Sequence, residues 1–130
     1  LVTSCLLKGE KIKLTSCKQK RDLLGIDEVI TLFIHLIKDL ERDKTFDVIN
    51  VCNGSPVLMR SFLLKLCNLL GCDKKLLQFG RIPMRSNEPM VSYGSSKKAK
   101  NLFGWKPNTV DNSVRSYVDM IMKLNENGLF

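Results

Sequence analysis

The sequence lacks a glycine-rich phosphate-binding loop. It contains eight glycines, but none of them forms the Gly-x-x-Gly-x-x-Gly spacing that opens a helix after a strand in dinucleotide-binding domains. That spacing matters because glycine lets the backbone approach a pyrophosphate closely. We therefore expect that this chain binds no dinucleotide cofactor by itself.

Cysteine and histidine do not occur in metal-binding or disulfide patterns. The five cysteines are odd in number and include no Cys-x-x-Cys pair, which argues against a disulfide framework and a zinc site. The single histidine, His35, has no partner at ligand spacing, so we predict a partly buried packing residue and no metal site. Unpaired cysteines are typical of a reducing compartment and predict a cytoplasmic protein.

Long hydrophobic runs are also missing. Lys, Asp or His interrupts every apolar stretch well short of a membrane span, and no signal-like segment follows Leu1. A length of 130 residues suits one domain with its own core. We expect residues 1–130 to be a single domain, without a membrane partner, that belongs to a larger protein.

Positive charge exceeds negative charge. Lys and Arg number 21 against 13 Asp and Glu, giving a formal charge of +8, which attracts polyanions. The lysines are spread along the chain and are not interleaved with aromatic residues as in a base-stacking surface. A solvated lysine-rich face is therefore one reading, and a small basic nucleic-acid-binding module is kept as an alternative that we consider unlikely.

Helical and strand-like patterns alternate, which predicts an α/β fold of helices with short strands. The first long helix is expected to start at Asp27 as its N-cap and to end near Arg42, with its apolar face on Val29, Ile30, Phe33, Ile37 and Leu40. Ser55 and Pro56 are expected to open the next helix. The remaining elements are expected as helices over 1–8, 57–70, 96–103 and 110–125, strands over 11–15, 46–52 and 76–79, and a long loop over 80–94.

Three segments occur in an order typical of a known family. They are Gln19-Lys-Arg-Asp-Leu-Leu-Gly-Ile-Asp-Glu-Val29, Ile49-Asn-Val-Cys-Asn-Gly54, and Phe79-Gly-Arg-Ile-Pro-Met-Arg-Ser-Asn-Glu-Pro-Met90, the last continuing to Phe103-Gly-Trp-Lys-Pro107. Together they resemble the C-terminal, substrate-binding part of the extended short-chain dehydrogenase/reductases, the NAD-dependent nucleotide-sugar epimerases, dehydratases and reductases.

The resemblance implies a small substrate-binding lobe that lacks the Rossmann dinucleotide-binding half. NAD or NADP would then bind in that missing N-terminal half, and the ligand of this chain would be a nucleotide-diphosphate sugar, in a branch that makes deoxysugars for bacterial surface polysaccharide. The implied partner is the Rossmann domain. A stand-alone dimeric interaction domain without catalysis remains an alternative, because an apolar patch normally covered by that domain could form a homodimer.

The same resemblance assigns substrate-binding roles to three residues. Arg21 and Arg85 would clasp the diphosphate, which suits the rigid, permanently charged guanidinium fork, and Glu88 would accept the ribose hydroxyls. Standing alone, Arg21 could instead form an ion pair with Asp22 or Asp27, and Arg85 with Glu88 could be an exposed loop pair.

Four more residues are expected to have structural roles near this site. We expect Asp22 to brace the turn at Arg21 and Asp27 to cap the following helix. Asn50 and Asn53 would satisfy backbone groups at the strand end. Trp105 is expected to be a packing anchor for the helix that precedes it.

No catalytic residue is expected in this chain. Tyr93 and Lys97 match the family's Tyr-x-x-x-Lys spacing, which works when both side chains share one helix face. Here the pair lies after the substrate loop, is interrupted by Gly94, and has no cofactor loop before it. The sequence also departs from the family pattern at Gly25, Glu28 and Cys52, where we expect the Cys52 side chain to crowd a close backbone approach.

Overall fold

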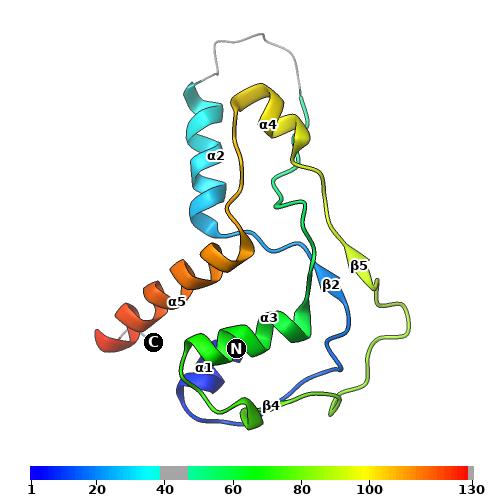
Figure 1. Ribbon diagram of the computed structural model, residues 1–130, viewed down its shortest axis with the longest axis vertical. Helices are drawn as coiled ribbons and strands as arrows, with labels where there is room; N and C mark the ends of the chain where they lie inside the picture. Colours follow the sequence, from blue (N-terminus) through cyan, green and yellow to red (C-terminus); the bar gives the residue numbers. More distant parts are fainter. Residues whose placement is uncertain (39–46, 129–130) are drawn as a thin grey trace.

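The computed structural model describes residues 1–38 and 47–128. Within these ranges the chain is a mixed α/β structure of five α-helices and short strands in small sheets (Figure 1). The helices are α1 Val2–Leu7, α2 Ile26–Lys38, α3 Met59–Leu69, α4 Lys97–Phe103 and α5 Val110–Glu126. The strands are β1 Ile12–Lys13, β2 Lys20–Arg21, β3 Val57–Leu58, β4 Leu77–Gln78 and β5 Val91–Ser92, and a short 3₁₀ helix, η1, covers Lys74–Leu76.

The larger hydrophobic core joins α1, α3 and α5 to the parallel pair β1 and β4. Its buried residues come from all of these elements and from the β1–β2 connection: Leu6, Ile12, Cys17, Leu63, Leu66, Cys67, Leu70, Leu77, Val114 and Val118. On α3 and α5 they recur three or four positions apart, so each helix turns one apolar stripe to the core.

A second, smaller core packs α2 against α4. It consists of Leu32, Ala99 and Trp105. The Trp105 ring is 3% exposed, and its Nε1–H donates to the main-chain oxygen of Glu28 at 3.2 Å. The expectation that Trp105 is a packing anchor is confirmed.

The three-stranded sheet has the order β3–β2–β5. Strand β2 lies in the centre, antiparallel to β3 and parallel to β5, with Arg21 in register with Val57 and Ser92. The segment expected as a loop over 80–94 thus contains a short strand, β5, near its end, and this pairing brings that part of the segment beside Arg21.

Several helix ends agree with the sequence prediction. Gly9 and Gly104 follow α1 and α4 with φ of +68° and +65°, a left-handed conformation that glycine adopts without strain. The Thr109 side chain caps α5 by accepting from Asn112 N–H. Among the described residues, no helix has the length and apolarity needed to cross a membrane.

Two expected element boundaries are wrong. The helix expected from Val57 begins at Met59, because Val57 and Leu58 pair with β2 as β3. The strand expected over 46–52 is absent from residues 47–52, which are not paired with any strand in the described ranges, and residue 46 lies outside them.

The apolar face expected on the first long helix is not the side that packs inside the described residues. Ile30, Phe33 and Ile37 are 51%, 54% and 64% exposed, whereas α2 buries Glu28 and Leu32. Its predicted end near Arg42, and Leu40, lie outside the described residues. His35 is exposed, contrary to the expectation of a packing histidine, because it faces away from the α2–α4 contact.

Asp27 does not cap α2. The helix begins one residue earlier, at Ile26, which places Asp27 inside its first turn. The neighbouring carboxylate performs the capping role instead: Glu28 Oε2 accepts from Gly25 N–H at 2.8 Å. Glu28 fits this position because its longer side chain reaches back toward the helix start.

Candidate functional site

The Arg21 side chain lies on the central strand β2 and holds the 80–94 loop. Its Nη1 donates to the main-chain oxygens of Lys20 at 2.8 Å and Pro89 at 2.7 Å, and its Nη2 forms an ion pair with Glu88. The two side chains are 25% and 22% exposed. The structure therefore brings together two of the three residues expected to bind substrate, with Glu88 and not Asp22 or Asp27 as the ion-pair partner of Arg21.

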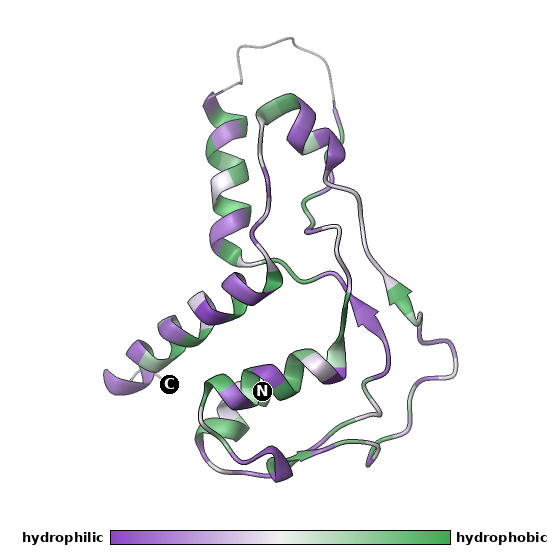
Figure 2. Cartoon of the chain, in the orientation of Figure 1, coloured by the Kyte–Doolittle hydropathy of each residue, from purple (hydrophilic) through white to green (hydrophobic). Residues whose placement is uncertain are grey.

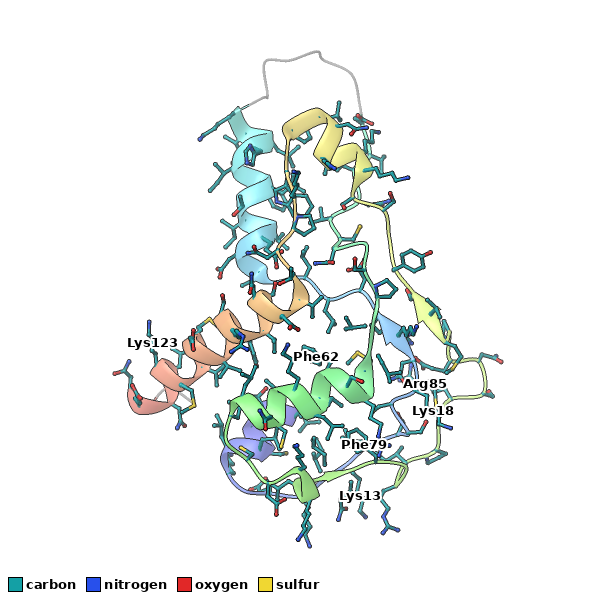
Figure 3. All side chains as sticks on the ribbon, in the orientation of Figure 1. Lys13, Lys18, Phe62, Phe79, Arg85 and Lys123 are labelled. Carbon is teal, nitrogen blue, oxygen red and sulfur yellow. The ribbon has the colours of Figure 1, made fainter. Side chains whose placement is uncertain are left out.

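Arg85 lies on the same loop and is exposed. Its main-chain oxygen accepts from Glu88 N–H at 3.2 Å, so Arg85 and Glu88 share one turn. In the view of Figure 3, Arg85 is labelled below β2, in the lower right part of the molecule. The loop thus carries an exposed positive side chain three residues before the carboxylate that pairs with Arg21.

A small cavity adjoins Arg21. Its volume is about 240 Å³, and it is lined by Arg21, Asp22, Leu24, Val51, Cys52, Ser92, Tyr93 and Gly94. The sequence reasoning did not single out Ser92 as a site residue. Ser92 lies beside Arg21 because β2 and β5 pair in parallel register. This pairing joins segments that are far apart in the sequence, so no local sequence pattern predicts it.

Asp22 fixes the walls of this cavity. Its carboxylate accepts from the N–H groups of Asn53 and Gly54, both at 2.8 Å, and of Gly94 at 3.3 Å. Asn53 in turn donates from Nδ2 to Asn108 O at 2.7 Å, while Asn50 is exposed. Asp22 therefore ties the end of β2 to two other segments that lie far away in sequence.

Cys52 fills the space where those segments meet. A Cβ atom at Gly94 would lie 2.8 Å from the Cys52 Sγ, so residue 94 has room only for glycine unless Cys52 moves. Burial, and secondly the Asp22 carboxylate, raise the pKa of the Cys52 thiol above its ordinary value. A thiol that stays protonated is a poor nucleophile, and this favours a packing role for Cys52.

The Tyr93 and Lys97 pair does not have catalytic geometry. Helix α4 begins at Lys97, and Tyr93 lies before it, directly after β5. The two residues therefore do not share a helix face. Within the part of the chain that the structure describes, no group of three His, Cys, Asp or Glu residues is placed to hold a metal ion.

A second cavity is larger and mostly apolar. It has a volume of about 520 Å³ and lies between α1, α3, α5 and the connection from β2 to α2. Glu28 is at its wall, 7% exposed, and accepts from Asn108 N–H at 2.5 Å and Ser113 Oγ–H at 2.6 Å. These contacts anchor the start of α5 to the start of α2.

Comparisons with known proteins place the chain beside parts of larger enzymes. CDP-abequose synthase from Salmonella typhimurium is 29% identical over 109 residues, which are 82% of this chain and 36% of that protein. The chain therefore spans little more than a third of the length of this curated relative. No protein-family profile matches the chain.

Solved structures share the fold. The dTDP-glucose 4,6-dehydratase of Bacillus anthracis, in complex with NAD, superposes with a TM-score of 0.77 at 20% identity, covering 96% of this chain and 39% of that one. UDP-glucose 4-epimerase of Thermotoga maritima, with UDP-glucose, gives a TM-score of 0.76 at 22% identity, covering 94% and 38%. At this identity the likeness shows a common fold.

Proposed function

Because the chain matches a portion of the NAD-dependent nucleotide-sugar epimerases, dehydratases and reductases of the extended short-chain dehydrogenase/reductase family, we propose that it is the substrate-binding lobe of such an enzyme. In this proposal Arg21 and Arg85 bind the diphosphate of a nucleotide sugar, and Glu88 accepts the ribose hydroxyls. The name of the curated relative makes a CDP-linked sugar the first ligand to test.

The observation that supports this proposal best is the packing of the 80–94 loop on β2. It places Glu88 in contact with Arg21 although the residues are 67 positions apart. Of the three residues that the family resemblance assigns to one site, Arg21 thus lies on β2, and Arg85 and Glu88 lie on one turn. A carboxylate beside a diphosphate is tolerated only if it faces the sugar hydroxyls, so binding would draw Glu88 away from the Arg21 guanidinium.

Arg21 keeps donors for such a ligand. Within the described residues, its contacts use two bonds from Nη1 and one from Nη2, whereas a guanidinium carries five N–H donors. The main-chain contacts to Lys20 and Pro89 fix the plane of the group before the ligand arrives. A fixed guanidinium loses less freedom on binding, which favours a bidentate phosphate contact.

The nicotinamide cofactor belongs, in this proposal, to a separate Rossmann unit. The relatives whose structures contain NAD or NADPH are more than twice as long as the part that this chain covers. The described residues place no Tyr and Lys on one helix face at the site. The role of this chain would therefore be orientation and nucleotide recognition, while hydride transfer takes place with the other unit.

Isothermal titration of the chain with CDP, CMP, UDP and dTDP tests the proposal. Charge-assisted contacts contribute roughly 1.5–3 kcal/mol each, and millimolar binding corresponds to about 4 kcal/mol, so we expect high-micromolar to millimolar affinity for the diphosphates. Arg21→Ala and Arg85→Ala should abolish binding. The matched control is Arg115→Ala, which removes an exposed arginine on α5. This substitution should leave nucleotide binding unchanged.

Two results would contradict the proposal. One is equal affinity for CMP and CDP, because the site is proposed to hold a diphosphate. The other is a loss of nucleotide affinity in Arg115→Ala as large as the loss in Arg21→Ala. Binding would then depend only on the net charge of the chain.

A further inference from the structure

The apolar cavity between α1, α3 and α5 has the size of a small-molecule site. Its volume is about 520 Å³, within the roughly 300–1,000 Å³ that is typical of ligand pockets. Figure 2 shows apolar residues along both α3 and α5, the helices that flank it. Ile26, Tyr117 and Met120 line the cavity and are 63%, 37% and 43% exposed. The cavity therefore opens to solvent, and a ligand can enter it.

The charged groups on the wall of this cavity are all acidic. Asp27 and Glu28 line it, and within the described residues no Lys, Arg or His does. The absence of basic side chains is unexpected in a chain with 21 Lys and Arg against 13 Asp and Glu. The wall therefore repels an anion, such as a nucleotide phosphate, and attracts a cation.

Both carboxylates can accept a hydrogen bond from a ligand. Glu28 is 7% exposed and accepts three hydrogen bonds, whereas a carboxylate offers about four acceptor positions. The remaining position is on Oε1, which accepts from Asn108 N–H alone. Asp27 is exposed, and the Thr31 hydroxyl donates to its main-chain oxygen, which leaves the Asp27 carboxylate open to a ligand.

Two aromatic rings belong to the same wall. Phe62 comes from α3 and Tyr117 from α5. In the view of Figure 3, Phe62 is labelled just above α3, toward the start of α5. Tyr117 Oη forms a hydrogen bond with Thr3 Oγ1 at 2.9 Å, which fixes the position of its ring. The negative face of an aromatic ring attracts ammonium groups, so the rings and the carboxylates favour the same kind of ligand.

We propose that this cavity binds a small organic cation, an ammonium group attached to an apolar body. The ammonium pairs with Asp27 and Glu28, while the apolar body packs against Phe62 and Tyr117. A metal ion fits less well, because within the described residues no three His, Cys, Asp or Glu side chains are placed to hold one. A neutral apolar ligand also fits less well, because it would take water from the acidic groups without supplying a charge or a donor. The proposal does not rest on the nucleotide site.

Titration of the ¹⁵N-labelled chain with three matched probes at neutral pH tests the proposal. Phenethylamine is a cation at this pH, 2-phenylethanol is its neutral counterpart, and 3-phenylpropanoate is its anionic counterpart. We expect phenethylamine to bind at least about fivefold more tightly than 2-phenylethanol, a difference of roughly 1 kcal/mol, and 3-phenylpropanoate to bind most weakly. Phenethylamine should shift the amides of residues 24–28 and 113–117, which border the cavity.

Asp27→Asn separates the effect of charge from the effect of shape. It should lower the affinity for phenethylamine about two- to fivefold and leave the affinity for 2-phenylethanol unchanged. The matched control is Asp119→Asn, which removes an exposed carboxylate of α5 away from the cavity lining and should not change either affinity. Phe62→Leu keeps the wall apolar but removes a ring, so it should reduce the preference for phenethylamine. Far-ultraviolet circular dichroism should show that each variant is folded like the parent chain.

Three outcomes would overturn the proposal. The first is binding of 2-phenylethanol as tightly as phenethylamine. The second is an equal loss of phenethylamine affinity in Asp27→Asn and Asp119→Asn, because binding would then reflect the net charge of the chain. The third is a titration with phenethylamine that shifts no amide of residues 24–28 or 113–117.

Discussion

The buried Glu28 carboxylate should be a large single contributor to stability. Its two oxygens accept from Gly25 N–H, Asn108 N–H and Ser113 Oγ–H at 2.5–2.8 Å. Hydrogen bonds to a charged group contribute about 1.5–3 kcal/mol each, so the three contacts set an upper bound of roughly 4.5–9 kcal/mol. Glu28 also lines the larger cavity, and water entering there can satisfy part of the orphaned donors.

We therefore expect Glu28→Ala to lower the unfolding free energy by about 3–4 kcal/mol, a large fraction of the roughly 5–15 kcal/mol of a typical domain. Glu28→Gln should cost less, about 1–2 kcal/mol, because the amide keeps one acceptor oxygen but turns its NH₂ group toward a backbone donor. Urea denaturation can be followed by the fluorescence of Trp105, the single tryptophan, whose indole donates to Glu28 O.

Asp27 provides the matched control. It lies next to Glu28 in the first turn of α2 and is exposed, so Asp27→Ala should cost less than about 1 kcal/mol, the size of a helix-dipole contribution. If Glu28→Ala and Asp27→Ala destabilise the chain equally, the argument that Glu28 joins α2 to α5 is refuted.

Two further predictions concern cysteine. Burial is the main cause that raises the pKa of Cys67 above its ordinary value of 9.0, so the folded state holds the thiol proton more tightly than the unfolded state does. The stability from this thiol is therefore fully present below pH 9.0 and is lost as pH rises through the raised pKa. In urea titrations, Cys67→Ala should flatten the fall in unfolding free energy as pH rises above 9.0; an unchanged slope would contradict the assignment. Gly94→Ala should lower the unfolding free energy by about 1–3 kcal/mol, because the added methyl group overpacks against Cys52. Thermal unfolding should show that adding Cys52→Gly recovers part of this stability. If the losses of stability from the two substitutions add, the two residues do not compete for space.

Local signals were enough to predict some elements. Glycine at positive φ follows α1 and α4, which end close to the expected residues 8 and 103, and α5 covers Val110–Glu126, close to the expected range 110–125. These features depend on residues within one or two helical turns, so the sequence contains the whole signal.

Features that depend on distant partners could not be predicted in the same way. The Ser55-Pro56 pair is a good helix start, yet pairing with β2 extends Val57 and Leu58 as β3. Periodicity found an apolar face on α2 but could not tell which of two faces packs inside the chain. The family resemblance named Arg21, Arg85 and Glu88, whereas the ion pair of Arg21 with Glu88 became visible only with the strand order.

Chemical-shift mapping of the ¹⁵N-labelled chain during titration with CDP, followed by competition with a short DNA duplex, tests the central claim most directly. We predict that CDP shifts the amides of Arg21, Ser92 and the 85–90 turn, and that DNA does not displace it. Displacement by DNA, with shifts spread over the lysine-rich segments and none at Arg21 or the 85–90 turn, would contradict the nucleotide-sugar site and support a nucleic-acid-binding module.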